Sequence, residues 1–155
     1  MGNSLTRFTA ISGQTTATTS GEYILAVDAN GGPFQVTEIH VGMQDSEGLI
    51  EVVTALSANV TKSGAASITP TTLNLVDSGD AYETAPAEVA VAGATGTISV
   101  ASGTTKYGPF PLEADVVAVI PLPLRVSTTS SVIVKVTPDT NNSLCTAQII
   151  YKPLY

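Results

Sequence analysis

The sequence predicts an all-β fold, an antiparallel β-sandwich of the jelly-roll kind built as a single domain. Segments rich in β-branched and small polar residues alternate with clusters of Gly, Pro, Asn and Asp. At least eight of these segments recur at a spacing of about 8–12 residues, which is typical of sandwiches and barrels. No stretch has the periodicity of an amphipathic helix. A length of 155 residues and a hydrophobic content of 43% suit one domain with its own core. We therefore expect one sandwich over residues 1–155.

The first strands are expected at residues 5–11 and 22–27, separated by a polar Ser/Thr/Gly loop over residues 14–21. In the second strand, Tyr23, Leu25 and Val27 share one face, as the period of two in a strand requires. The strand is expected to end at the turn signal of residues 28–33, where Asn and Gly tolerate positive φ and Pro cannot continue a ladder.

The next two strands are expected at residues 34–43 and 49–56. In the first, the apolar phase shifts between Val36 and Ile39, which predicts a β-bulge. The second is long enough to be read as a helix, but its β-branched content favours a strand. Beyond it, residues 68–76 suit a short edge strand, because Pro70 lacks an N–H for a central ladder.

The second half of the chain returns to clear strand patterns after an Ala-rich, extended segment. Residues 116–120 are apolar on both faces, which predicts a central strand, and Pro121 and Pro123 are expected to end it. In the last strand Cys145, Ala147, Ile149 and Tyr151 alternate with polar residues. The expected strands are residues 97–101, 106–110, 116–120, 124–127, 132–136 and 145–152.

Charge is sparse and acidic. Charged residues make up 12% of the chain, about half of the ~25% usual in soluble domains, and the net charge is −7. No Lys or Arg lies between Arg7 and Lys62. Direct nucleic-acid binding is therefore disfavoured, because it depends on cations that neutralise phosphates. No run of about 18 apolar residues is present, so we expect no membrane partner. A surface with few charges suits a subunit that packs against others.

The ends and the cysteine content indicate where the chain is made. The first residues lack the basic and apolar regions of a secretory signal. The single cysteine, Cys145, cannot form a disulfide within the chain. We therefore expect synthesis in the cytoplasm.

The residues that normally carry catalysis are scarce, so the sequence predicts no enzyme, no cofactor and no metal. His40 is the only histidine, and it lies on the polar phase of its strand, facing solvent or a neighbouring subunit. No Gly-x-Ser-x-Gly elbow is present. Cys145 alternates with apolar residues and is expected to be a buried thiol. One His and one Cys cannot supply the four ligands of structural zinc. Asp28-x-Asn30 lacks the rest of a calcium loop and is expected to be a turn.

Two segments are predicted to act as assembly arms, residues 1–20 and residues 77–96. The second is too apolar for a free linker, and Pro86 and Gly93 argue against a continuous core strand. Long segments without periodicity in compact domains are commonly functional. The tyrosines are candidate anchors, because aromatic residues dominate interaction hot spots. The predicted contact residues are Leu5, Phe8, Tyr82, Val89, Val91, Tyr151 and Tyr155.

The tract at residues 68–74 (Ile-Thr-Pro-Thr-Thr-Leu-Asn), with the Ala- and Pro-containing segment up to Gly96, resembles bacteriophage virion proteins. Gly-Pro-Phe-Pro at residues 108–111, followed by an apolar strand, adds to this resemblance, which covers residues 34–136. It implies a small β-sandwich, often a jelly roll, that decorates or cements a capsid or forms head fibres and tail parts. Such proteins are commonly trimers or clusters around capsomers. No individual functional residue carries over from this resemblance.

Three functions are therefore open at this point. The leading one is a non-enzymatic virion protein that decorates a bacteriophage capsid from its exterior, with itself (as a trimer) and the major capsid protein as partners. The second is a receptor- or carbohydrate-binding module of a phage fibre or tail. The third is an enzyme whose site forms between subunits from carboxylates such as Glu38 and Glu51.

Overall fold

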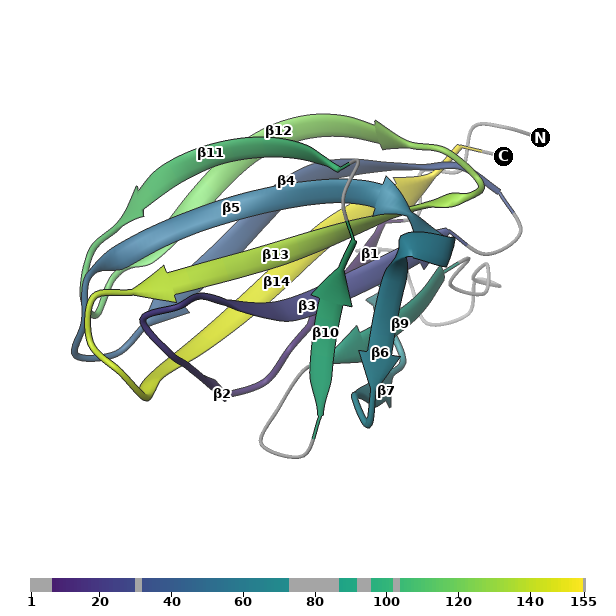
Figure 1. Ribbon diagram of the computed structural model, residues 1–155. Helices are drawn as coiled ribbons and strands as arrows, with labels where there is room; N and C mark the ends of the chain where they lie inside the picture. The colour runs from purple at the N-terminus through teal and green to yellow at the C-terminus, as the bar shows by residue number, and fades with distance from the viewer. Residues whose placement is uncertain (1–6, 30–31, 73–86, 92–95, 102–103, 155) are drawn as a thin grey trace.

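Two antiparallel β-sheets pack face to face in the computed structural model of the chain (Figure 1). The structure describes residues 7–29, 32–72, 87–91, 96–101 and 104–154. The helix in this part of the chain is the single turn of 3₁₀ helix η1 (Ser57–Asn59), and no described helix is long and apolar enough to cross a membrane. The all-β sandwich predicted from the sequence is confirmed.

The first sheet, sheet A, has β14 at its centre. Its order is β12-β4-β14-β1-β8, and β2 pairs with β14 beyond the end of β1. Its strands are β12 (Val117–Val126), β4 (Phe34–Met43), β14 (Ser143–Pro153), β1 (Phe8–Ile11), β8 (Thr71–Thr72) and β2 (Thr15–Ala17).

The second sheet, sheet B, has the order β11-β5-β13-β3-β10-β6, and β9 lies between β3 and β7. Its strands are β11 (Thr105–Leu112), β5 (Gly48–Leu56), β13 (Ser130–Pro138), β3 (Glu22–Ala29), β10 (Thr97–Val100), β6 (Val60–Ser63), β9 (Ala87–Val91) and β7 (Ala66–Ile68).

The order of the principal strands is that of a jelly roll. Strands β1, β4, β12 and β14 belong to sheet A, and β3, β5, β11 and β13 belong to sheet B. Along these eight strands the chain crosses to the other sheet at every step except from β5 to β11. Two four-stranded layers joined in this way form the double Greek key of jelly rolls.

The core lies between the inner faces of the two sheets. Alternate residues of each strand point into it. In β4 the inward side chains are Phe34 and Val36 before a bulge, and Ile39, Val41 and Met43 after it. An aromatic group closes one end: the ring of Tyr151 lies 5.8 Å from that of Phe8 and 5.2 Å from that of Phe34, centroid to centroid. All three side chains are buried.

The β-bulge predicted in residues 34–43 is confirmed. The register between β4 and β14 shifts so that Ile150 pairs with Glu38 while Tyr151 pairs with Val36. Thr37 is the additional residue, and its Oγ1 donates a hydrogen bond to the carbonyl of Ile150 at 3.2 Å. The bulge restores the inward phase of Phe34 and Val36 after Ile39 and Val41.

The prediction that residues 116–120 form a central strand is wrong. Residues 117–120 lie in β12, which pairs only with β4 among the described strands and forms the edge of sheet A. The strand also continues through Pro121 and Pro123, where its register against β4 shifts. An edge strand tolerates proline, because its outer side has no ladder partner for the missing N–H.

Residues 57–104 form an insertion between β5 and β11, and its described strands lie on the side of the sandwich opposite to β12. Its strands β6 and β10 pair with each other and β10 reaches β3, while β8 extends sheet A beyond β1 (Figure 1). Ile98 packs with Ala26, Val53 and Ile133 in a second apolar cluster on the outer face of sheet B. The outer face of sheet B is therefore partly covered by the chain itself.

The extended segment 77–96 needs a correction. Residues 87–91 form strand β9, which pairs with β3 from Ala29 to Leu25 and with β7. Five residues between Pro86 and Gly93 are enough for a short ladder, although too few to produce a strand pattern in an Ala-rich sequence. This part of the predicted arm belongs to sheet B.

Candidate functional site

The outer face of sheet A carries a group of exposed apolar side chains. They arise because β12 is apolar on both faces: its even-numbered residues face the core, and Val117 and Val119 face outward, 60% and 54% exposed. The other members come from β1, β14 and the residue before β12. Across the sheet, His40 of β4 and Gln148 of β14 lie between Val119 and Ile11. Exposed apolar side chains spread over one face of a sheet can serve as an interaction site. We call it the sheet A patch: Ile11, Val116, Val117, Val119 and Leu144.

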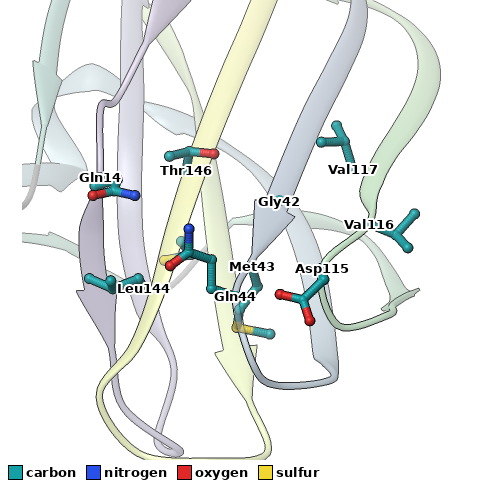
Figure 2. Close-up of a pocket in the computed structure, with 10 residues that line it drawn as sticks. Gln14, Gly42, Met43, Gln44, Asp115, Val116, Val117, Leu144 and Thr146 are labelled. Carbon is teal, nitrogen blue, oxygen red and sulfur yellow. The ribbon is translucent and has the colours of Figure 1, made fainter.

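A shallow groove of about 330 Å³ crosses one end of this patch (Figure 2). Its walls combine the apolar side chains of Val116, Val117 and Leu144 with polar groups from other elements. The polar lining residues are Gln14, Gln44, Asp115 and Thr146. The groove can therefore offer amide, hydroxyl and carboxylate groups beside an apolar surface.

Gly42 lies in the lining of the groove because it has no side chain. It pairs with Val117 on one side and Thr146 on the other, and it points outward between them. A Cβ at this position would lie 3.4 Å from Val117 Cγ2 and 3.6 Å from Thr146 Oγ1. The missing side chain lowers the surface between two strands.

Asp115 fixes the turn that leads into β12. Its φ of 58° lies in the left-handed region, which Asp tolerates better than most residues. Its backbone N–H donates to the carbonyl of Met43 at 2.9 Å, and its Oδ1 accepts a hydrogen bond from the backbone N–H of Asp45 at 3.2 Å. These bonds join the segment before β12 to the end of β4. They therefore fix the position of the groove wall formed by Asp115, Val116 and Val117.

His40 lies on the outer face of sheet A, as its polar phase predicts. Its Nε2 lies 3.4 Å from Glu38 Oε1, and both side chains are partly exposed. In the described part of the chain, no three His, Cys, Asp or Glu side chains form a group able to hold a metal ion. Glu51 lies on the other sheet, paired with Lys135, so Glu38 and Glu51 do not meet within one chain.

Cys145 is buried on the inner face of β14, as predicted. Its Sγ donates a hydrogen bond to the carbonyl of Thr15 at 3.5 Å. Burial, followed by the negative charge of Glu22, raises the pKa of the thiol to about 11. The thiolate, which is the nucleophilic form, is therefore disfavoured at neutral pH.

A polar cluster that the sequence did not predict lies beneath the insertion. Ser131 is fully buried, and its Oγ donates to Asp28 Oδ1 at 2.5 Å and lies 2.7 Å from Ser57 Oγ. The Lys62 ammonium pairs with the other oxygen of Asp28. Asp28 is thus in strand β3 and not in a turn. Asp28 and Ser131 belong to central strands of sheet B, and Ser57 and Lys62 belong to the insertion. Because the cluster joins these two parts of the chain, we interpret it as a structural anchor.

The predicted contact residues fall into three groups. The prediction is wrong for Phe8 and Tyr151, whose rings are 1% and 0% exposed and pack in the core. Val89 and Val91 lie in β9, paired with Val27 and Leu25 of β3. Leu5, Tyr82 and Tyr155 lie outside the described residues.

The predicted N-terminal arm, residues 1–20, is corrected in the same way. Residues 8–11 and 15–17 are strands β1 and β2 of sheet A, and Phe8, Ala10 and Ala17 are buried. Among residues 8–11, only Ile11 is exposed and belongs to the sheet A patch. The sequence signal for the patch is the second apolar face of residues 116–120, a pattern that a central strand would share.

No known protein family, curated protein or solved structure matches the chain. The function is therefore inferred from the patch, the groove and the charge of the chain.

Proposed function

We propose that the chain is a non-enzymatic structural protein of a bacteriophage virion, which decorates or cements the capsid through protein–protein contacts. The observation that carries this proposal is the sheet A patch. Val117 and Val119 expose more than half of their side-chain surface on an edge strand, where a partner would bury them. Burying apolar surface of this kind contributes about 25 cal/mol per Å².

Composition and fold support the same function. A net charge of −7 and few cations suit a position on the outer surface of a shell, away from the packaged nucleic acid. Jelly rolls are common among capsid proteins. The Cys145 thiol is buried, which disfavours its use as a nucleophile.

The proposed partners are other copies of the chain, with a trimer as the expected assembly, and the major capsid protein. The protein would be made in the host cytoplasm and bind to the exterior of the capsid. The sheet A patch would contact a partner, while the insertion covers part of the outer face of sheet B.

The experiment is to isolate virus particles from cultures that produce this chain, on a density gradient followed by a high-salt wash, and to detect the chain by mass spectrometry. The expected result is that the chain stays with the particles and that deleting its gene lowers the temperature at which they release their genome. Intact particles without the chain, while the chain remains in the soluble fraction, would overturn the proposal.

The groove favours a second candidate, a receptor- or carbohydrate-binding module. Gln14, Gln44, Asp115 and Thr146 line it beside apolar side chains, a combination that can bind the hydroxyls and the apolar face of a sugar. A glycan array probed with the full chain tests it. Binding that is lost on Gly42→Phe, which fills the groove, would support this candidate, and an array without signal would exclude the glycans tested.

A further inference from the structure

The two sides of the sandwich differ in how their edges are protected. On the β1 and β3 side, the insertion pairs β8 with β1, and β9 and β10 with β3. On the other side, β12 and β11 are terminal in the described sheets. An open edge strand has backbone groups that can pair with another strand.

Of these two open edges, β12 has the features of a contact. Its first four residues, 117–120, contain no proline, and Val117 and Val119 among them face outward. In β11 the proline-free end presents the polar side chains of Thr105 and Lys106, both exposed. The apolar edge is therefore β12.

The charges on this edge have a symmetric arrangement. Residues 116–124 contain no titratable side chain, and this stretch is bounded by Asp115 and Arg125. Both lie five residues from Ile120, in opposite directions along the chain. Arg125 is exposed and forms no salt bridge with any described residue.

We propose that two copies of the chain pair antiparallel along β12, about a two-fold axis at Ile120. In this register Asp115 of each copy lies beside Arg125 of the other, Val117 opposite Pro123, and Val119 opposite Pro121. A two-fold contact must be self-complementary, and a strand with opposite charges at its two ends fulfils this condition. The inference rests on the proposed function, because it identifies one contact of the proposed self-association.

The contact is expected to be reversible. Pro121 and Pro123 have no N–H, so the ladder between the two strands has fewer hydrogen bonds than a full antiparallel pair. The remaining stabilisation of the contact comes from burial of the Val117 and Val119 side chains and from the two ion pairs. In a trimeric assembly this contact would join two trimers, and without other contacts it would give a dimer.

The experiment is sedimentation equilibrium of the full chain with three variants: Asp115→Arg, Arg125→Asp and the double exchange. Each single exchange places like charges together at both ends of the contact, so we expect its dissociation constant to rise by at least about tenfold. The double exchange restores opposite charges and should return the constant to within about threefold of the original chain. At a protein concentration between the dissociation constants of the original chain and of the single variants, the original chain should have the mass of a dimer. The single variants should then have the mass of a monomer.

Asp139→Arg is the matched control, since Asp139 is exposed and lies in the turn between β13 and β14. It should leave the association unchanged. Thermal unfolding checks that each variant folds. If Asp115→Arg fails to fold for loss of its bond to Asp45, Arg125→Asp and Val119→Lys, both at exposed positions, still decide the outcome.

Two results would overturn the contact: association that neither single exchange weakens, or an original chain that remains a monomer at millimolar concentration. Neither result bears on whether the chain binds the capsid, which the particle experiment measures. If the chain is found in particles but the variants associate as tightly as the original chain, the proposed function stands and this contact is wrong.

Discussion

Ser131 donates a hydrogen bond to Asp28 across 103 positions of sequence, with 2.5 Å between Oγ and Oδ1. The same Asp28 pairs with Lys62, and Ser131 lies beside Ser57. The pair thus connects two central strands of sheet B to the start of the insertion. Because these groups are largely buried, each depends on the others for its hydrogen bonds.

Replacing Asp28 with Ala should loosen the insertion before the sandwich. The change removes the carboxylate that accepts the Ser131 hydrogen bond and pairs with Lys62, and loss of a partner by a buried polar group costs about 1–3 kcal/mol. Amide exchange of β6 and β10 should accelerate more than that of β13. Asp139→Ala, at an exposed position, serves as the control. Unchanged exchange in β6 would contradict the anchoring role.

Phe8 and Ile11 provide a matched pair on one short strand, with 1% and 51% of their surface exposed. Phe8→Ala should lower the free energy of unfolding by about 3–5 kcal/mol, because it leaves a cavity beside Tyr151. Ile11→Ala should change it by less than about 0.5 kcal/mol. Urea unfolding measures both. Equal effects would mean that β1 does not pack as described.

Gly42 and Gly48 should respond oppositely to Ala. At Gly42 the new Cβ would meet its neighbours at ordinary contact distance, and Ala in a strand is more favourable than Gly by about 0.5–1 kcal/mol. At Gly48 the Cβ would lie 2.5 Å from the Thr137 carbonyl oxygen and 2.9 Å from Pro138 Cα. We expect Gly42→Ala to raise the unfolding temperature and Gly48→Ala to lower it. The reverse order in a thermal scan would refute the packing described around both glycines.

Cys145 should make the chain less stable in alkaline solution. Burial raises the pKa of its thiol from 9.0 to about 11, so the folded state holds this proton more tightly than the unfolded state. The corresponding stability is fully present below pH 9 and is lost between pH 9 and about 11, by up to about 1.4 kcal/mol per pH unit. Unfolding free energies from pH 8 to 11 should fall more steeply for the original chain than for Cys145→Ala. Parallel curves would contradict a buried thiol.

Much of the fold could be predicted because local pattern and burial agree in most strands. The alternation around Cys145 and Ile149 and the phase shift between Val36 and Ile39 were sufficient to predict the last strand and the bulge. The jelly-roll order itself was an expectation from the class of fold, since pairings such as β1 with β14 leave no local signal.

There is a physical reason why the position of β12 in the sheet could not be predicted from the sequence. An apolar strand reads the same whether both of its faces are buried within the chain or one of them is exposed. Val117 and Val119 therefore resembled core residues, although they form the candidate site. The anchor at Asp28 was missed because its partners, Ser131 and Lys62, come from separate strands, and none of them has a motif of its own.

The place of β14 in sheet A also determines when the protein can fold during synthesis. Strands β4 and β1 do not pair with each other; they pair with β14 from opposite sides. Until residues 143–153 have left the ribosome, sheet A lacks the strand that joins its two halves, and the apolar inner face of β4 is without its partner. Completion of this fold must therefore follow translation of its last strand, and the unfinished chain is exposed to aggregation until then.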